Sequence, residues 1–267
     1  MSNRTDLKHN FLDNIIIRFD FNGIFENELE KCVSTLKKTL KKNKYNFAHE
    51  EYAKEVDFKI NDPDIELISP TNIRQQKVYV FHNVEDGLTF KISRSFAIIN
   101  SSNKKYMSFS DYAPPLIEII NILKTITYFN ITRFGIRKIN ICILKDITKL
   151  YNYFKKEHFY LYDKEKTQIY EQRQTYIQNQ YNINLIRNIV LGKYDENSAY
   201  QIAIDADIYT LSSEQIDELL NNHSKINEMN NILFEIYISM LTKKFIKQLT
   251  RDIFVDNNLI GVVKNNV

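Results

Sequence analysis

The sequence of 267 residues contains no tryptophan, five glycines, four prolines and two cysteines. With so few glycines the chain has no glycine-rich loop, and neither a GxGxxG nor a GxxxxGK[ST] pattern occurs. The common phosphate-binding motifs are therefore excluded. A Gly-x-Ser-x-Gly nucleophile elbow is absent as well. From these absences we expect no bound cofactor and favour a protein that is not an enzyme, while an RNA-processing enzyme with a cryptic active site stays open as an alternative.

The two cysteines, Cys32 and Cys142, are predicted to be buried free thiols, because a disulfide framework or a structural zinc site needs more cysteines or a Cys/His cluster. The histidines show no metal-ligand spacing, so we expect no metal site; they are His9, His49, His82, His158 and His223. The sequence therefore offers no recognisable redox or metal chemistry.

Long apolar runs are also missing. Residues 116–123 form the most apolar segment, which is too short to span a bilayer and includes Glu118. Residues 1–10 are polar and lack the apolar core of a secretory signal. We therefore expect a soluble cytoplasmic protein.

The composition is that of a globular protein, with 43% hydrophobic and 13% aromatic residues. Lysine and arginine number 36 against 33 acidic residues, which gives a net charge of +3. This near balance does not by itself favour nucleic acid as a partner.

Hydrophobic periodicity predicts alternating strands and helices. Asp86-Gly87 indicates a hairpin turn, and the last helix is expected to break near Thr242. A helix should also follow the N-cap candidates Ser110 and Asp111 and end near residue 128. The predicted strands cover 14–21, 52–60, 77–83, 88–99, 132–144, 169–178, 183–191 and 200–210, and the other helices cover 26–42, 146–159, 216–220 and 226–249.

Both halves of the chain show the order strand, helix, strands, helix. We therefore predict a single α+β domain of two pseudo-repeats, about residues 11–130 and 132–251, with flexible termini. The two halves should form a curved, mostly antiparallel sheet with long helices packed on one face and the other face partly open.

Two arginines lie in the central strand, where a buried cation needs an acceptor. Arg133 and Arg137 are close in sequence, and the strand at residues 202–209 places Asp205 and Asp207 on one face. We predict that these two strands meet and that the four residues form a network. A structural role is favoured, and an anion-binding or catalytic role is the alternative.

Aromatic and basic strand residues are candidates for a binding surface on the open face. Such a surface suits nucleic acid, through stacking and phosphate contacts, and suits a protein partner equally well. The candidates are Tyr79, Phe81, Lys91, Arg94, Tyr176, Gln178 and Arg187.

The segment Arg133-Phe134-Gly135-Ile136-Arg137-Lys138-Ile139-Asn140 resembles the Arg-Ile-Gly-Leu-Arg-Tyr-Ile-Asn stretch of an uncharacterised, sporadically distributed bacterial family of similar length. Lys138 stands where that family has tyrosine. Shorter similarities at residues 14–19, 85–87, 205–208 and 233–235 extend the resemblance over nearly the whole chain. The resemblance implies no established reaction or cofactor. The patchy distribution implies carriage on mobile elements or in defence islands, beside a partner gene.

Together these features predict a non-enzymatic binding or scaffold protein, an accessory component of a bacterial mobile-element or anti-phage defence system. We expect a protein partner, and a homo-oligomer is compatible with the sequence. Two alternatives stay open: a protein that binds RNA or single-stranded DNA through the open face, and a sensor of an anionic ligand.

Overall fold

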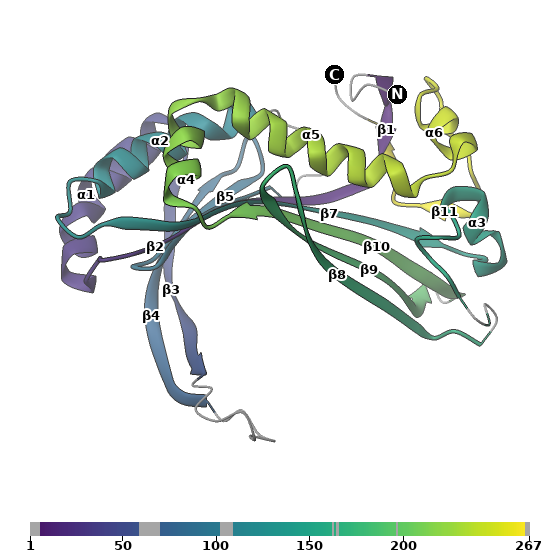
Figure 1. The fold of residues 1–267 in the computed structure, drawn as a ribbon, viewed down its shortest axis with the longest axis horizontal. Helices are drawn as coiled ribbons and strands as arrows, with labels where there is room; N and C mark the ends of the chain where they lie inside the picture. Colours follow the sequence, from purple (N-terminus) through teal and green to yellow (C-terminus); the bar gives the residue numbers. More distant parts are fainter. Residues whose placement is uncertain are drawn as a thin grey trace. The chain divides into compact units, whose positions relative to one another are not determined.

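The structure is a computed structural model that describes residues 6–58, 70–101, 109–161, 163, 166–195 and 197–264. The described residues form helices and mostly antiparallel strands (Figure 1). This confirms the predicted α+β class and the antiparallel character of the sheet.

Contacts between Cα atoms divide the chain into two compact units. Unit 1 comprises Met1–Ile17, Asn100–Tyr112 and Arg133–Val267, and unit 2 comprises Arg18–Ile99 and Ala113–Thr132. These bounds differ from those of the predicted pseudo-repeats because the first strand of each repeat contributes residues to both units. The duplication itself stays a prediction.

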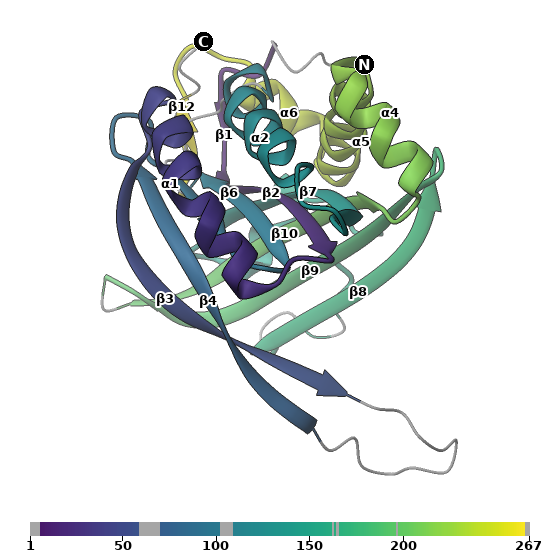
Figure 2. The same cartoon turned by 90° about the vertical axis from the view of Figure 1, so that its left-hand side faces the viewer.

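Unit 2 contains four consecutive strands that are hydrogen-bonded neighbours in chain order and end beside β2 (Leu12–Asn22). The helix α1 (Glu26–Lys42) packs on the first of them and has the predicted bounds. Figure 2 shows β3 and β4 side by side, as their antiparallel register requires. The four strands are β3 (Asn46–Phe58), β4 (Pro70–Asn83), β5 (Leu88–Ile92) and β6 (Phe96–Ser101), and α2 (Phe109–Leu123) follows them.

The predicted Asp-Gly hairpin joins β4 and β5. Gly87 has a φ of +64°, which glycine adopts at little cost. The predicted strand 88–99 is wrong in one respect, because a turn at Ser93 divides it into β5 and β6. The Ser93 hydroxyl accepts hydrogen bonds from the backbone N–H groups of Ser95 and Phe96, and so replaces ladder bonds that a continuous strand would make.

Unit 1 contains the strand order β2-β7-β10-β9-β8. The bounds are Asn130–Leu144 for β7, Ile169–Gln178 for β8, Tyr181–Tyr194 for β9 and Asn197–Thr210 for β10. The helix α4 (Ser213–Asn221) leads into α5 (His223–Met240), which runs beside β7 and β10 in Figure 1 and packs on β10. The predicted break near Thr242 is confirmed, because Thr242 caps α6 (Lys243–Leu249) by accepting a hydrogen bond from the Phe245 N–H.

Two expectations for unit 1 are wrong. The helix predicted over 146–159 is a 3-10 turn, η2 (Ile147–Lys149), and one turn of α-helix, α3 (Leu150–Tyr153), after which Phe154 bridges to Leu241. Residues 9–10 and 259–264, which were expected to be flexible, include short strands: β1 (His9–Asn10) pairs with β12 (Val263–Lys264), and β11 (Leu259–Ile260) pairs with β7.

An aromatic cluster explains both departures. The ring of Phe11 lies 6.1 Å from the rings of Phe154 and Phe245 and 5.1 Å from that of Tyr237. These side chains come from distant parts of the sequence, and burying them holds the segments around them. Within the described residues, no helix has the length and apolar character needed to cross a membrane.

Candidate anion-binding site

The central strand meets the acidic strand as the sequence predicts. β7 and β10 are antiparallel neighbours. Arg137 donates from Nε to Asp205 Oδ1 at 2.7 Å and from Nη2 to Asp205 Oδ2 at 2.5 Å, and Arg133 donates from Nη2 to Asp207 Oδ2 at 2.7 Å. Because each guanidinium already has a carboxylate, the geometry favours a structural role for these four residues over binding of an external anion.

Two neighbours fix the position of Arg133. Its guanidinium carbon lies 4.6 Å from the centroid of the Tyr209 ring, and a Cβ at Gly135 would come within 2.9 Å of its Nη2. Glycine at position 135 therefore leaves room for the guanidinium. Burial raises the pKa of Asp207, and this effect exceeds the opposing effect of Arg133 and Arg137.

The aromatic open-face candidates of unit 2 are wrong as surface residues. Tyr79 and Phe81 are 3% and 1% exposed. The four consecutive residues 78–81 of β4 are all buried. Successive side chains therefore do not alternate between buried and exposed there, as they would in a strand with one face toward solvent.

The two basic candidates of unit 2 are less buried. Lys91 donates to Glu51 Oε1 at 2.6 Å across β5, β4 and β3. Arg94 lies half-buried in the turn between β5 and β6. Neither Lys91 nor Arg94 lines the cavity next to His158 or the cavity next to Gln180.

Arg187 is the unusual residue of unit 1. It is 2% exposed and interrupts the buried stripe of β9 between Leu185 and Ile189. Its Nη2 donates to Gln174 Oε1 at 2.6 Å, its Nη1 lies 3.2 Å from His158 Nδ1, and its Nε has no hydrogen-bond partner. Within the described residues no carboxylate forms an ion pair with Arg187. The side chain thus carries a buried positive charge that is held only by neutral groups.

His158 must accept the hydrogen bond at Nδ1, because the Arg187 guanidinium can only donate. Burial lowers the pKa of His158, and the charge of Arg187 lowers it further. The site therefore contains one cation and a neutral imidazole near pH 7.

We expect the substitution Arg187→Met to raise the pKa of His158, because it removes the nearby charge that disfavours the imidazolium. Since the folded-state pKa of His158 lies below its ordinary value of 6.5, this residue adds stability above that pH, and the contribution is lost as the pH falls through the folded-state pKa. An NMR titration of the histidine side chains measures the change, with the other four histidines as internal references. A pKa that stays the same in the variant would contradict the contact.

A polar stripe on β8 faces the same side of the sheet as Arg187. The register sets Tyr170, Gln172, Gln174, Tyr176 and Gln178 opposite the buried odd-numbered residues of β9. Tyr176, Gln178 and Arg187 are among the residues predicted from the sequence, whereas Gln174, Tyr170 and His158 are not. A sequence signal for Gln174 and Tyr170 exists, because glutamine and tyrosine alternate along one strand while the next strand has an arginine within an aliphatic stripe. His158 lies outside any strand, and no such pattern indicates it.

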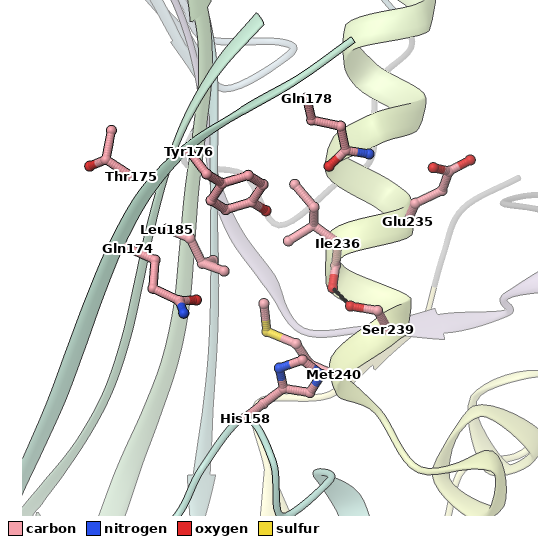
Figure 3. Close-up of a pocket in the computed structure, with 10 residues that line it drawn as sticks. All are labelled: His158, Gln174, Thr175, Tyr176, Gln178, Leu185, Glu235, Ile236, Ser239 and Met240. Atoms are coloured by element: carbon pink, nitrogen blue, oxygen red, sulfur yellow. Dashed lines mark hydrogen bonds between the residues drawn. The ribbon is translucent and has the colours of Figure 1, made fainter.

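A cavity of about 560 Å³ opens between β8 and α5. Figure 3 shows the Tyr176 ring and the Ile236 side chain pointing toward one another, with His158 near Met240. Ser239 Oγ donates to the Ile236 carbonyl at 2.7 Å. Gln174 and His158, the two partners of Arg187, both line the cavity, and the other lining residues are Thr175, Tyr176, Gln178, Leu185, Glu235, Ile236, Ser239 and Met240.

In the described part of the chain, no group of three or more His, Cys, Asp or Glu residues is arranged so that it could hold a metal ion. No protein-family model matches the sequence, and no match to a curated protein was found.

Proposed function

We propose that this chain is a non-enzymatic binding protein that takes a small monocarboxylate in the cavity beside Arg187. The observation that carries the proposal is a fully buried guanidinium whose Nε has no hydrogen-bond partner and which has no carboxylate partner among the described residues. It adjoins a cavity whose walls include its two neutral partners, Gln174 and His158. An ion in such surroundings is unfavourable unless an opposite charge completes the site.

The Nε/Nη2 edge of the Arg187 guanidinium fits a carboxylate. Nε and Nη2 form one edge of an arginine, and Arg137 uses that edge to bind both oxygens of Asp205. In Arg187 the same edge is half-filled, because Nη2 donates to the Gln174 amide oxygen and Nε has no hydrogen-bond partner among the described residues. A carboxylate that displaces the Gln174 oxygen would complete two parallel hydrogen bonds, as in the Arg137 pair.

The charge of the site favours a single negative charge on the ligand. Arg187 supplies one positive charge, the lowered pKa keeps His158 neutral, and Glu235 on α5 adds a negative charge to the cavity wall. A phosphate dianion would leave excess negative charge here. A monocarboxylate matches the single charge of the guanidinium and adds less negative charge beside Glu235 than a phosphate dianion would.

A thermal-shift experiment with acetate, propionate and benzoate tests the proposal, with inorganic phosphate as the competing anion. A ligand at a hundred times its dissociation constant stabilises the folded state by about 2.7 kcal/mol, which raises Tm by roughly 5–10 °C for a chain of this size. The rise should occur in the wild type and in the control Arg251→Met, whose side chain is exposed, and be absent in Arg187→Met. A rise with phosphate alone, an equal rise in Arg187→Met, or no rise with any carboxylate contradicts the proposal.

The order of elements supports the duplication as a further part of the proposal. β2, α1, β3 to β6 and α2 form the first series, and β7, α3, β8 to β10 and α5 form the second. Both read strand, helix, strands, helix, and we expect the long helix of each series to cover one face of its strands. The link to a bacterial defence or mobile element, and to a partner gene product, stays a prediction from the resemblance. Tyr79 and Phe81 are buried and cannot stack on bases, which leaves the exposed Tyr176 as the aromatic candidate for the nucleic-acid alternative.

A further inference from the structure

We propose that β8 pairs with β8 of a second copy of this chain, antiparallel and centred on Gln172. β8 is the last strand of the sheet order in the described part of the chain, with β9 as its neighbour. Its side chains are mostly exposed, and Ile169 and Ile177 are each 73% exposed. The strand contains neither proline nor lysine, the residues that commonly protect a sheet edge from pairing.

The backbone of β8 has one side available for another strand. The Gln168 carbonyl accepts a hydrogen bond from the Leu191 N–H at 2.8 Å. Because backbone groups alternate in direction along a strand, the even-numbered residues turn toward β9. The odd-numbered residues from 169 to 177 therefore turn their N–H and C=O groups outward, where an added strand can pair with them.

Charge selects the register. Two copies of β8 related by a two-fold axis must pair odd-numbered residues with odd-numbered ones. Centring on Gln172 sets Glu171 opposite Arg173 of the second copy, twice by symmetry. Centring on Arg173 would set two guanidiniums opposite one another, and centring on Gln174 would leave both charged residues opposite uncharged ones. The Gln172 register is the one that is complementary to itself.

This register also brings the second copy to the cavity. Gln174 lines the cavity and contacts Arg187, and the pairing sets it opposite Tyr170 of the second copy. Each cavity would then have an aromatic side chain of the other copy beside its polar wall. The self-pairing itself does not depend on what the cavity binds.

Disulfide formation tests the register. In a Cys32→Ser background, Gln172→Cys places two thiols on the axis at a non-hydrogen-bonded pair, where Cα atoms lie about 4.5 Å apart, within the range for a disulfide. We expect mild oxidation to give a covalent dimer for Gln172→Cys and much less for the matched variant Gln174→Cys. Equal cross-linking of both variants, or none for Gln172→Cys, would overturn the proposal.

A charge exchange tests the contact without any cross-link. Arg173→Glu sets like charges opposite one another twice and should weaken self-association by about tenfold or more in sedimentation velocity. The double variant Glu171→Arg with Arg173→Glu restores opposite charges and should recover the association. A wild type that stays monomeric at the highest concentrations, or a double variant as weak as the single one, would rule out this pairing.

Discussion

Arg187→Met should raise the free energy of unfolding of the ligand-free protein by about 1–2 kcal/mol, within the range seen when buried ionic groups are replaced by apolar ones. The guanidinium is desolvated but has only an amide and an imidazole as acceptors. Methionine has a similar length, removes the buried charge and fits beside Leu185 and Ile189 on the buried face of β9. Chemical denaturation followed by circular dichroism measures the change.

Two other arginine-to-methionine variants make this result specific. Arg137→Met should destabilise the protein, because it leaves Asp205 without its bidentate partner. Arg251→Met lies on the surface and should change little. A loss of stability in Arg187→Met as large as in Arg137→Met would mean that neutral acceptors satisfy Arg187, and would remove the physical basis of the anion site.

The second large effect is expected for Asp207→Ala, which should lower the free energy of unfolding by about 2–3 kcal/mol at neutral pH. Breaking a buried pair typically costs about 3–5 kcal/mol. We expect somewhat less because the side chains of Arg133 and Asp207 are 20% and 19% exposed. The cost of the substitution arises from the Arg133 guanidinium, which loses its carboxylate acceptor. The intact pair itself adds little net stability, because burial raises the pKa of Asp207.

A double replacement distinguishes this origin from a loss of packing. Arg133→Met combined with Asp207→Leu removes both charges and should recover most of the stability lost in Asp207→Ala. Asp217→Ala, at an exposed position of α4, is the matched control and should be nearly neutral. If Asp207→Ala melts at the wild-type temperature, Arg133 does not depend on that carboxylate.

The sequence predicted the central pairing because two independent signals agree there. Alternation puts Asp205 and Asp207 on one face of β10, and the two arginines of β7 require acceptors. α1, β8 and the Asp-Gly hairpin were likewise predictable, since helical periodicity, strand alternation and turn chemistry are local properties of the chain.

Long-range contacts produced the departures. Residues 146–159 have helical periodicity, but Phe154 leaves the helix to bridge to Leu241 and to join the cluster with Phe11 and Phe245. Residues 259–260 pair with β7 and residues 263–264 pair with β1, which no local pattern indicates. In each case the area buried by a distant partner outweighs local propensity.

The amino-acid order by itself determined the α+β class, the positions of most strands and the meeting of two arginines with two aspartates, because these follow from periodicity and charge along the chain. Only the tertiary structure decided that Arg187 is buried and that Gln174 and His158 hold it. An arginine in a strand gives the same sequence pattern whether its guanidinium faces water or the core. The surroundings of Arg187 come from β8, from α5 and from the segment after α3. These distant segments bury Arg187 without an ion-pair partner in the described part of the chain, whereas Arg133 and Arg137 each have an aspartate.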